Sequence, residues 1–413
     1  MKILIYGINF SPELTGIGKY TGEMAEFLSS KENDVTVVTA PPYYPEWRVK
    51  PGFKSYKYSK KYLNGMTIYR CPLYVPNKLN TFKRILHLLS FSISSSIILI
   101  SKIFTKPDVV IVIAPSFLCA PFGIFFCKIT GAKSVIHFQD FEFDAMFSLG
   151  MMKKGFLAKL FFLFEKFIIK KFDLVTTISR KMIESLKKKG ISKDKIYFFP
   201  NWVDIDFIKP EILNKNSKKI FSEETFSKVV LYSGNIGNKQ GLEIIIDVAE
   251  LMQPKENLKF IICGSGANKE KLINYSNQKK LNNIKFMELV SYDELPNLIN
   301  AADIHLVIQK KGTADAFLPS KLATILGAGG FSIVTAENDS ELGILNKENP
   351  GVISLVNPED KDALKDALIQ LLNNSDSNFN VNARIYAEKY LNKNQIINSF
   401  IKEISILKNT NTV

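Results

Sequence analysis

Residues 1–39 read MKILIYGINFSPELTGIGKYTGEMAEFLSSKENDVTVVT, and this stretch decides the fold. A short apolar run, Met1–Gly7, is followed by a glycine-containing turn and then by a helical pattern over Tyr20–Leu28. A second apolar run, Asp34–Thr39, completes the segment. Strand, turn, helix and strand in this order predict a βαβ unit with buried parallel strands. A secretory leader would need a longer apolar core and a small-residue cleavage site.

The same alternation continues along the chain and predicts two domains. A chain of 413 residues exceeds the roughly 250–300 at which one hydrophobic core stops growing. A polar stretch without periodicity, residues 209–228, separates two series of strands. We predict an α/β protein with two doubly wound, Rossmann-like domains, residues 1–205 and 206–380, facing a cleft. A helix within 381–413 is expected to return to the first domain. The further strands are expected at 108–113, 133–137, 174–178, 229–232, 258–263, 284–287 and 304–308.

The charge is divided unevenly between the two halves of the chain. The net charge is +14; residues 1–200 hold 30 basic and 14 acidic residues (+16), and residues 201–413 hold 24 and 26 (−2). The N-terminal half is therefore expected to meet an anionic partner. Nucleic acid is the weakest candidate for that partner, because no recognised binding motif accompanies the charge.

Two apolar stretches of the N-terminal half favour a membrane surface. Residues 151–171, MMKKGFLAKLFFLFEKFIIKK, predict a basic, aromatic-rich helix at a bilayer interface, although a core helix with a solvated lysine edge is the alternative. Residues 85–100, ILHLLSFSISSSIILI, are shorter than a bilayer span and predict a buried or interfacial helix. Four scattered cysteines fit a reducing compartment. We therefore expect a cytoplasmic protein, peripheral on the inner face of the bacterial cytoplasmic membrane.

Glycine turns after strands are the first candidate binding elements. They let a ligand approach the backbone, and a following helix offers its free N–H groups to an anion. Two such turns at adjacent strand ends would suit a nucleotide diphosphate, although ordinary tight turns are the alternative. The candidates are Gly16 and Gly18 in the first domain, and Gly234, Asn235, Lys239, Gln240, Gly264 and Gly266 in the second.

Two further candidate sites lie beyond strands. Leu318–Thr324 predicts a helix start at which Lys321 could hold a diphosphate, or merely a capped structural helix. His137 and Asp140 follow the strand at 133–137 and could bind sugar hydroxyls or position an attacking hydroxyl, although a packed strand-end histidine is the alternative. Asp204 and Asp206 form a DxD pattern of the kind that holds a metal, which also arises often by chance.

Several of these motifs together resemble the family-four glycosyltransferases of GT-B fold. Pro200-Asn201-Trp202-Val203-Asp204 resembles the interdomain segment of that family, and the resemblance covers nearly the whole chain. It is greatest to the branch of colanic-acid and O-antigen glycosyltransferases, which includes enzymes assigned to fucose or N-acetylfucosamine transfer. The segments that carry it are residues 6–28, 40–45, 137–140, 233–243 and 318–322.

The resemblance implies a retaining transfer from a nucleotide sugar, without a catalytic metal or cofactor. The donors that it suggests are UDP-N-acetyl-L-fucosamine or another fucose-type nucleotide sugar. It implies a lipid-linked saccharide acceptor, bound by the first domain at an anionic membrane. In it, Gly16 and Gly18 would approach the reacting sugar and the diphosphate, and His137 and Asp140 would face the transferred sugar. The implied nucleotide-binding set is Gly234, Gly264, Gly266 and the segment Pro319, Ser320, Lys321, Leu322 and Thr324.

Two departures from the family pattern concern the donor. The paired glutamates of the family would fall at Ala316 and Thr324, so neither is present. The phosphate-binding Arg and Lys would fall at Asn235 and Gln240, with Lys239 adjacent as a substitute. The alternatives to a transferase are a nucleotide-sugar epimerase of similar architecture and a non-catalytic nucleotide-sugar-binding protein at the membrane. A metal-dependent transferase of the other fold type is a further alternative, which chelation would reveal.

Overall fold

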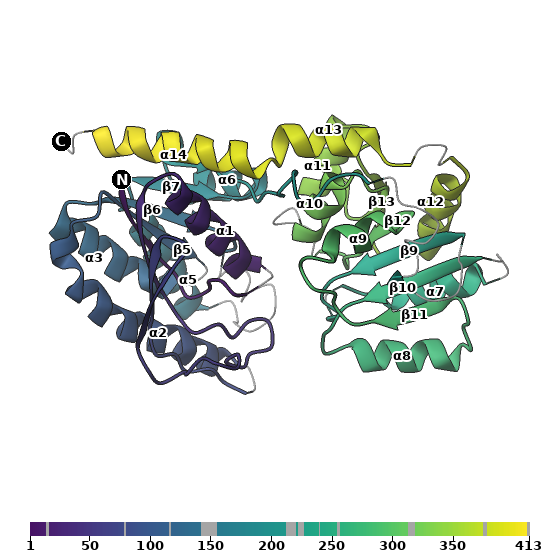
Figure 1. The fold of residues 1–413 in the computed structure, drawn as a ribbon, viewed down its shortest axis with the longest axis horizontal. Helices are drawn as coiled ribbons and strands as arrows, with labels where there is room; N and C mark the ends of the chain where they lie inside the picture. Colours follow the sequence, from purple (N-terminus) through teal and green to yellow (C-terminus); the bar gives the residue numbers. More distant parts are fainter. Residues whose placement is uncertain are drawn as a thin grey trace. The chain divides into compact units, whose positions relative to one another are not determined.

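The computed structural model describes residues 1–13, 16–77, 80–114, 117–141, 155–211, 220–221, 227–238, 240–253, 257–312, 319–374 and 378–410. The chain forms two compact units, labelled along the chain in Figure 1. Unit 1 comprises Met1–Pro200 together with Ile397–Val413, and unit 2 comprises Asn201–Ile396. The predicted α/β class, with two Rossmann-like sheets, is confirmed.

Unit 1 contains an eight-stranded sheet in the order β3-β4-β2-β1-β5-β6-β7-β8. All neighbouring pairs are parallel except β3 and β4. The strand at Val109–Ala114 is a fully buried apolar run, and its neighbour is buried from Ser134 to Phe138, which is typical of parallel strands covered by helices on both faces. The strands are β1 (Lys2–Tyr6), β2 (Asp34–Thr39), β3 (Ser59–Leu63), β4 (Met66–Arg70), β5 (Val109–Ala114), β6 (Lys133–Phe138), β7 (Leu174–Thr177) and β8 (Ile196–Phe198). The helices are α1 (Gly16–Ser30), α2 (Thr81–Ser101), α3 (Ala120–Thr130), α5 (Phe156–Ile169) and α6 (Arg180–Lys188), with 3-10 turns η1 (Ile103–Thr105), η2 (Phe117–Cys119) and η3 (Lys193–Lys195).

Unit 2 contains a six-stranded sheet in the order β11-β10-β9-β12-β13-β14, with every neighbouring pair parallel. This order places β9 at the centre, so the loops after β9 and β10 lie at the same edge of the sheet. The strands are β9 (Lys228–Ser233), β10 (Leu258–Cys263), β11 (Ile284–Met287), β12 (Ile304–Val307), β13 (Ser332–Thr335) and β14 (Ser354–Val356). The helices are α7 (Glu243–Leu251), α8 (Lys269–Gln278), α9 (Leu295–Asn300), α10 (Ser320–Gly327), α11 (Glu341–Glu348), α12 (Lys361–Asn374) and α13 (Val381–Tyr390).

The C-terminal segment differs from the single helix that its apolar spacing predicts. It forms α13 and a separate helix, α14 (Lys393–Asn409). The break is stabilised by Asn392, whose side-chain oxygen accepts hydrogen bonds from the backbone N–H groups of Asn394 and Gln395. Val203 also donates to Leu391 O at 2.8 Å and accepts from Lys393 N at 3.1 Å. The continuous helix is therefore ended by a strand-like contact with a distant part of the chain.

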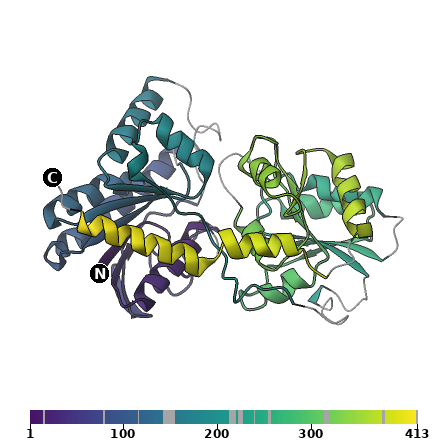
Figure 2. The ribbon, with the colours of Figure 1, turned by 90° about the horizontal axis from the view of Figure 1, so that it is seen from above.

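Helix α14 completes the core of unit 1 (Figure 2, yellow). Ile397, Phe400 and Ile404 are fully buried on one face. The Phe400 ring stacks on Phe199 with 4.2 Å between ring centroids. An ion pair between Lys408 and Asp108, at 3.0 Å, lies near the end of the helix. The last helix of the chain is thus part of the N-terminal unit.

Helix α2 is long and apolar enough to cross a membrane by length and composition, with a mean hydropathy of 1.6. One third of it is buried against the protein. Its Ser95 hydroxyl lies 2.7 Å from the hydroxyl of Tyr6 on β1, and Phe91 is fully buried. The inner face of α2 therefore belongs to the core of unit 1.

We expect Phe400→Ala to destabilise unit 1 by about 3–5 kcal/mol, because it removes a fully buried aromatic ring. The control is Ile406→Ala on the same helix, whose side chain is 62% exposed. The control should change stability by less than about 0.5 kcal/mol. Urea denaturation, followed by circular dichroism, measures both. Equal effects of the two variants would show that α14 does not complete this core.

Candidate functional site

The two glycine turns of unit 2 are joined to each other. Residues 234–237 follow β9 and residues 264–268 follow β10. Gly234 N donates to Cys263 O at 2.9 Å, and Ile236 N donates to Ser265 O at 2.8 Å. Asn268 N donates in turn to Ile236 O at 3.0 Å. The sequence analysis expected these turns at adjacent strand ends, and the structure brings them into direct backbone contact.

Glycine is required in these turns because the two backbones approach so closely. A Cβ atom at Gly264 would lie 1.9 Å from Gly234 O, and one at Gly266 would lie 2.3 Å from Ile236 O. Gly234 and Gly266 also have φ angles of 144° and 152°, which L-residues rarely adopt. The sequence alone offered two reasons for these glycines, the approach of a ligand or an ordinary tight turn. The structure adds a third reason, the contact of one turn with the other.

Lys321 lies beside this pair of turns, in the first turn of α10. Its Nζ atom is 3.9 Å from the centroid of the Tyr232 ring, and a Cβ at Gly234 would lie 3.0 Å from it. The Tyr232 hydroxyl donates to Asn235 O at 2.7 Å, which fixes the ring. Burial lowers the pKa of Lys321 to about 7. An anion bound here would favour the charged form, so the ammonium is suited to a phosphate group.

The other predicted residues of unit 2 divide between exposed and structural positions. Asn235 and Ser320 are exposed, whereas Leu322 is fully buried in the core and Pro319 is buried before α10. Gln240 accepts a hydrogen bond from Gly237 N at 3.1 Å through Oε1, so this oxygen closes its own turn. Thr324 donates to Ser320 O within the helix. Lys239 and Ala316 lie outside the described residues.

In unit 1, a buried glutamate that the sequence analysis missed organises the turn after β1. Glu13 is 2% exposed and accepts hydrogen bonds from Asn9 Nδ2 and from the backbone N–H groups of Tyr43 and Tyr44, at 3.0–3.1 Å. Burial raises the pKa of this carboxyl group. A Cβ at Gly18 would lie 2.4 Å from Glu13 Oε2, so Glu13 fills the space that this glycine leaves. Gly16 begins α1 with a φ of 60°.

Arg70, at the end of β4, was also missed. Its guanidinium donates to Ala40 O at 2.7 Å and to Ser11 O. Burial lowers the pKa of Arg70 to about 10, and the nearby Glu13 opposes that shift. The sequence held one signal, since Glu13 and Arg70 are charged residues next to apolar strand-end segments. That these two side chains hold residues 9–13 and 40–44 together could not be predicted without the order of the strands in the sheet.

His137 is enclosed at the end of β6. Its Nδ1 atom is 2.8 Å from Thr176 Oγ1, its Nε2 atom is 2.9 Å from Gln139 Nε2, and its ring packs edge-on against Phe199. Burial lowers the pKa of His137 to about 3, so the ring is neutral at neutral pH. This geometry favours the packed strand-end alternative for the imidazole. Asp140 is half-buried just beyond the strand.

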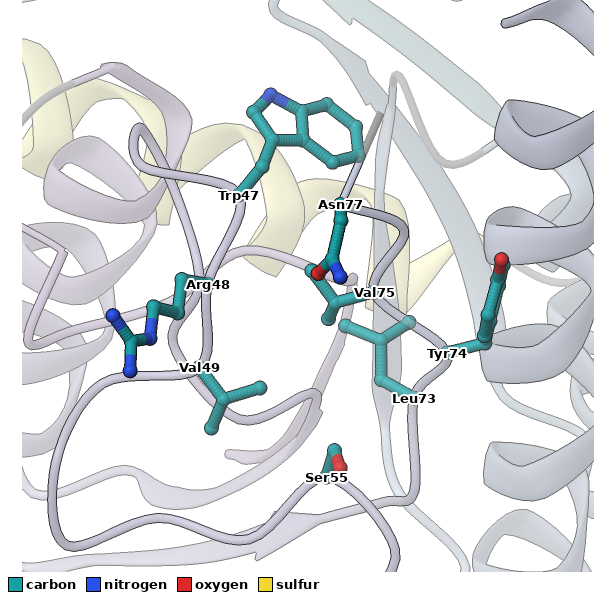
Figure 3. Close-up of a pocket in the computed structure, with 8 residues that line it drawn as sticks. All are labelled: Trp47, Arg48, Val49, Ser55, Leu73, Tyr74, Val75 and Asn77. Carbon is teal, nitrogen blue, oxygen red and sulfur yellow. The ribbon is translucent and has the colours of Figure 1, made fainter. Parts of the chain in front are cut away.

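A cavity of about 260 Å³ in unit 1 was not anticipated from the sequence. Figure 3 shows Val49, Leu73 and Val75 pointing toward one another, while Arg48 and Tyr74 point away to either side. The Trp47 indole lies at its edge and contacts the His87 ring, with 5.1 Å between centroids. Trp47 has a φ of 52°, which is unusual for a bulky residue. The lining residues are Trp47, Arg48, Val49, Ser55, Leu73, Tyr74, Val75 and Asn77.

The DxD pattern of the sequence has a structural role at Asp204. Asp204 Oδ1 accepts from Phe207 N at 3.2 Å, and Oδ2 lies 3.2 Å from Lys393 Nζ. Within the described residues, no group of three or more His, Cys, Asp or Glu side chains is arranged to hold a metal ion.

Replacing Glu13 with Ala should destabilise unit 1 by about 2–4 kcal/mol, because three buried donors lose their acceptor. Glu26→Ala on the exposed face of α1 is the matched control and should change stability by less than about 0.5 kcal/mol. Urea denaturation measures both. If the two variants were equally stable, the hydrogen bonds to Glu13 would not hold this loop.

The depressed pKa of Lys321 predicts a pH-dependent stability. The unfolded lysine has a pKa near 10.4, so between about pH 7 and 10 the unfolded chain binds more protons and stability rises with pH. Lys321→Met removes the buried ammonium and with it this pH dependence. The free energy of unfolding of the variant minus that of the natural protein should therefore be greatest at pH 6 and decline toward pH 9.5. Denaturation at pH 6, 8 and 9.5 tests this, with Lys347→Met, at an exposed position, as the control. A constant difference would contradict the depressed pKa.

Comparisons with known proteins agree on one family. Residues 14–207 match Glycosyltransferase Family 4, and residues 214–390 match Glycosyl transferases group 1. The chain is 43% identical over 418 residues to the Escherichia coli K12 protein named "Putative colanic acid biosynthesis glycosyl transferase WcaI", covering 98% of this chain and all of that protein.

Solved structures show the same fold at low sequence identity. Sucrose-phosphate synthase from Thermosynechococcus elongatus matches with a TM-score of 0.77 and 14% identity over 98% of this chain and 99% of that one. Anabaena HepE, solved in complex with UDP-glucose, matches with a TM-score of 0.69 and 14% identity over 98% of this chain and all of that one. Both family matches and the 43% identity to a full-length relative agree, so the chain belongs to glycosyltransferase family 4 and is a glycosyltransferase of GT-B fold.

Proposed function

We propose that this glycosyltransferase transfers a sugar, with retention and without a metal, to a lipid-linked saccharide in O-antigen, capsule or exopolysaccharide synthesis. The family membership supports the transfer, and the full-length similarity to a protein named for colanic acid biosynthesis supports the pathway class. The branch that the motifs resemble suggests UDP-N-acetyl-L-fucosamine or another fucose-type donor.

The position of Lys321 carries this proposal. Its ammonium lies beside the joined glycine turns at the carboxyl ends of β9 and β10, where parallel sheets bind their ligands. The paired glutamates of the family pattern are replaced, and Gln240 Oε1 already accepts a hydrogen bond. Among the residues that the structure describes, we therefore assign Lys321 as the side chain that binds the donor diphosphate. Asn235 and the N-terminal turn of α10, with Ser320, complete the proposed donor site.

The reaction that we propose follows from this assignment. The acceptor hydroxyl oxygen forms a bond to the anomeric carbon on the face from which the diphosphate departs. The bond between that carbon and the diphosphate oxygen breaks, and the hydroxyl proton passes to the departing diphosphate. Lys321, charged in the presence of the anion, stabilises the negative charge that develops on it. Within unit 1, His137 is neutral and already hydrogen-bonded, so we propose that it helps to shape a sugar-binding surface with Asp140 rather than transfers a proton.

For the acceptor, we propose the cavity of unit 1. Its volume of about 260 Å³ is of the order of a single sugar ring. The Trp47 indole offers an apolar face, and Ser55 and Asn77 offer groups that can bond hydroxyls. This combination suits a pyranose of the acceptor saccharide.

We propose a cytoplasmic location, with peripheral attachment to the inner face of the membrane. The four cysteines are buried and form no disulfide, which fits a reducing compartment. The net charge of +16 over residues 1–200 fits an anionic surface.

The test measures donor binding and transfer separately. Thermal shifts with UDP-, GDP- and dTDP-sugars, measured at pH 6.5 with EDTA present, should identify one selective nucleotide sugar. Lys321→Met should weaken that binding at least tenfold, whereas Lys347→Met should leave it unchanged. The selected donor is then incubated with lipid-linked saccharides, and NMR of the product should show the anomeric configuration of the donor. A Lys321→Met protein that binds the donor normally would refute the assigned site, and an inverted product would refute the mechanism.

A further inference from the structure

The outer face of α2 carries a continuous row of exposed apolar side chains. They recur every three or four residues, so they lie on one side of the helix, and their exposed fractions range from 39% to 91%. A surface helix of a soluble protein normally places polar residues there, and large exposed apolar patches mark interaction sites. We call this row, continued into η1, the α2 stripe; it consists of Phe82, Leu86, Leu89, Ile93, Ile97, Ile100 and Phe104.

Helix α3 widens this apolar surface on one flank. The two helices pack together, and Ser92 Oγ of α2 lies 3.5 Å from Cys119 Sγ, just before α3 begins. Figure 1 shows the two helices next to each other in unit 1. On α3, Phe122, Phe125 and Ile129 are 37%, 64% and 47% exposed. These side chains follow the same three-and-four spacing, so they extend the surface beyond a single helix.

A lysine- and tyrosine-rich segment borders the opposite flank. The Tyr58 hydroxyl donates to Ser94 O of α2 at 3.0 Å, and Ser94 and Ser92 lie on opposite sides of the α2 stripe in a helical projection. This border, residues 54–63, is KSYKYSKKYL; four of its residues are lysine and three are tyrosine. Each of these seven side chains is exposed. Lysine and tyrosine are the residues that anchor proteins at the headgroup level of a bilayer.

The sequence segments that form the stripe and its borders carry charge of one sign. Residues 47–107 contain twelve lysines and arginines and no aspartate or glutamate, and α3 adds Lys128 without an acidic residue. An anionic lipid surface complements this arrangement. A second copy of the chain, paired across a two-fold axis, would bring two basic borders together. The charge therefore favours lipid over self-association.

We propose that the α2 stripe and the exposed face of α3 dock unit 1 onto an anionic phospholipid bilayer, with α2 lying in the membrane plane. The lysines of residues 54–63 contact the headgroups. Helix α2 cannot cross the bilayer in this state, because its inner face is held by Tyr6, Pro72 and Tyr74. The inference specifies the membrane attachment proposed above and rests on it, but it does not depend on the sugar transfer.

This surface differs from the one that the sequence favoured. The residues of α5 also include exposed apolar side chains, Leu160, Leu163, Phe164 and Phe167. Among the side chains that the structure describes, the α2 stripe is the longer of the two, and the basic segment borders it through a direct hydrogen bond. The two surfaces can therefore be compared by matched substitutions at similarly exposed positions.

The test uses the full chain in co-sedimentation with vesicles of phosphatidylcholine alone or with 30% phosphatidylglycerol. The double substitution Ile93→Asn/Ile97→Asn should weaken binding to the anionic vesicles more than tenfold. Leu163→Asn/Phe167→Asn on α5 and Ile385→Asn on α13 are the controls, at exposed fractions of 55–59%, and should bind as the natural protein does. Lys60→Ser/Lys61→Ser should weaken binding about tenfold on anionic vesicles and little on neutral ones.

A second measurement follows one position directly. An environment-sensitive fluorophore on Ile97→Cys should shift to shorter wavelength when anionic vesicles are added, whereas the same label on Phe167→Cys should not. Urea denaturation and the nucleotide-sugar thermal shift show that each variant remains folded and binds its donor, so a failure of docking is separable from a failure of the transferase proposal. Loss of binding in the α5 variant alone would assign docking to α5. A different outcome would assign the stripe to a second copy of the chain. In that outcome the natural protein does not bind vesicles but forms a dimer, and the Ile93→Asn/Ile97→Asn variant is a monomer.

Discussion

The close approach of two backbone turns in unit 2 is the constraint on which the candidate donor site of this protein depends. With 1.9 Å between a Cβ at Gly264 and Gly234 O, no side chain fits between the turns. The turns are therefore held by their own hydrogen bonds, and Lys321 is placed against them by the Tyr232 ring. Unit 1 has a counterpart in Glu13, which holds two loops by accepting three hydrogen bonds. In both units the loops at the strand ends are ordered by internal contacts, so a ligand would meet groups already in position.

Most of the fold was readable because buried parallel strands are apolar runs. The predicted strands at 34–39, 258–263 and 284–287 have the bounds of β2, β10 and β11. The hairpin of β3 and β4 was missed, although Asn64-Gly65 is a typical hairpin turn and both residues have positive φ angles. The alternation around it is obscured by lysines and tyrosines that face solvent on an edge strand.

The parts that failed to emerge from the sequence depend on distant contacts. The break between α13 and α14 needs Val203, and the close packing of Gly264 needs Gly234. The sequence shows Glu13 as a charged residue beside an apolar run. It does not show its hydrogen-bond partners, because Tyr43 and Tyr44 lie on the loop that follows another strand. The glycine turns and Lys321 could be predicted as candidates because their positions after strands and at a helix start are visible in the local sequence. Why glycine is needed at each position becomes clear only from the contact with the neighbouring loop.

The return of α14 to unit 1 has a consequence for how the chain folds during synthesis. Unit 1 is encoded by the first 200 residues and by residues from 397 onward, so its core is incomplete while the ribosome makes the intervening unit. At typical elongation rates, about 200 residues correspond to roughly 10–40 s. Throughout that interval Phe199 lacks the ring of Phe400 that covers it in the finished protein. The nascent N-terminal unit therefore presents an apolar surface of the kind that chaperones bind, until α14 has been synthesised and covers it.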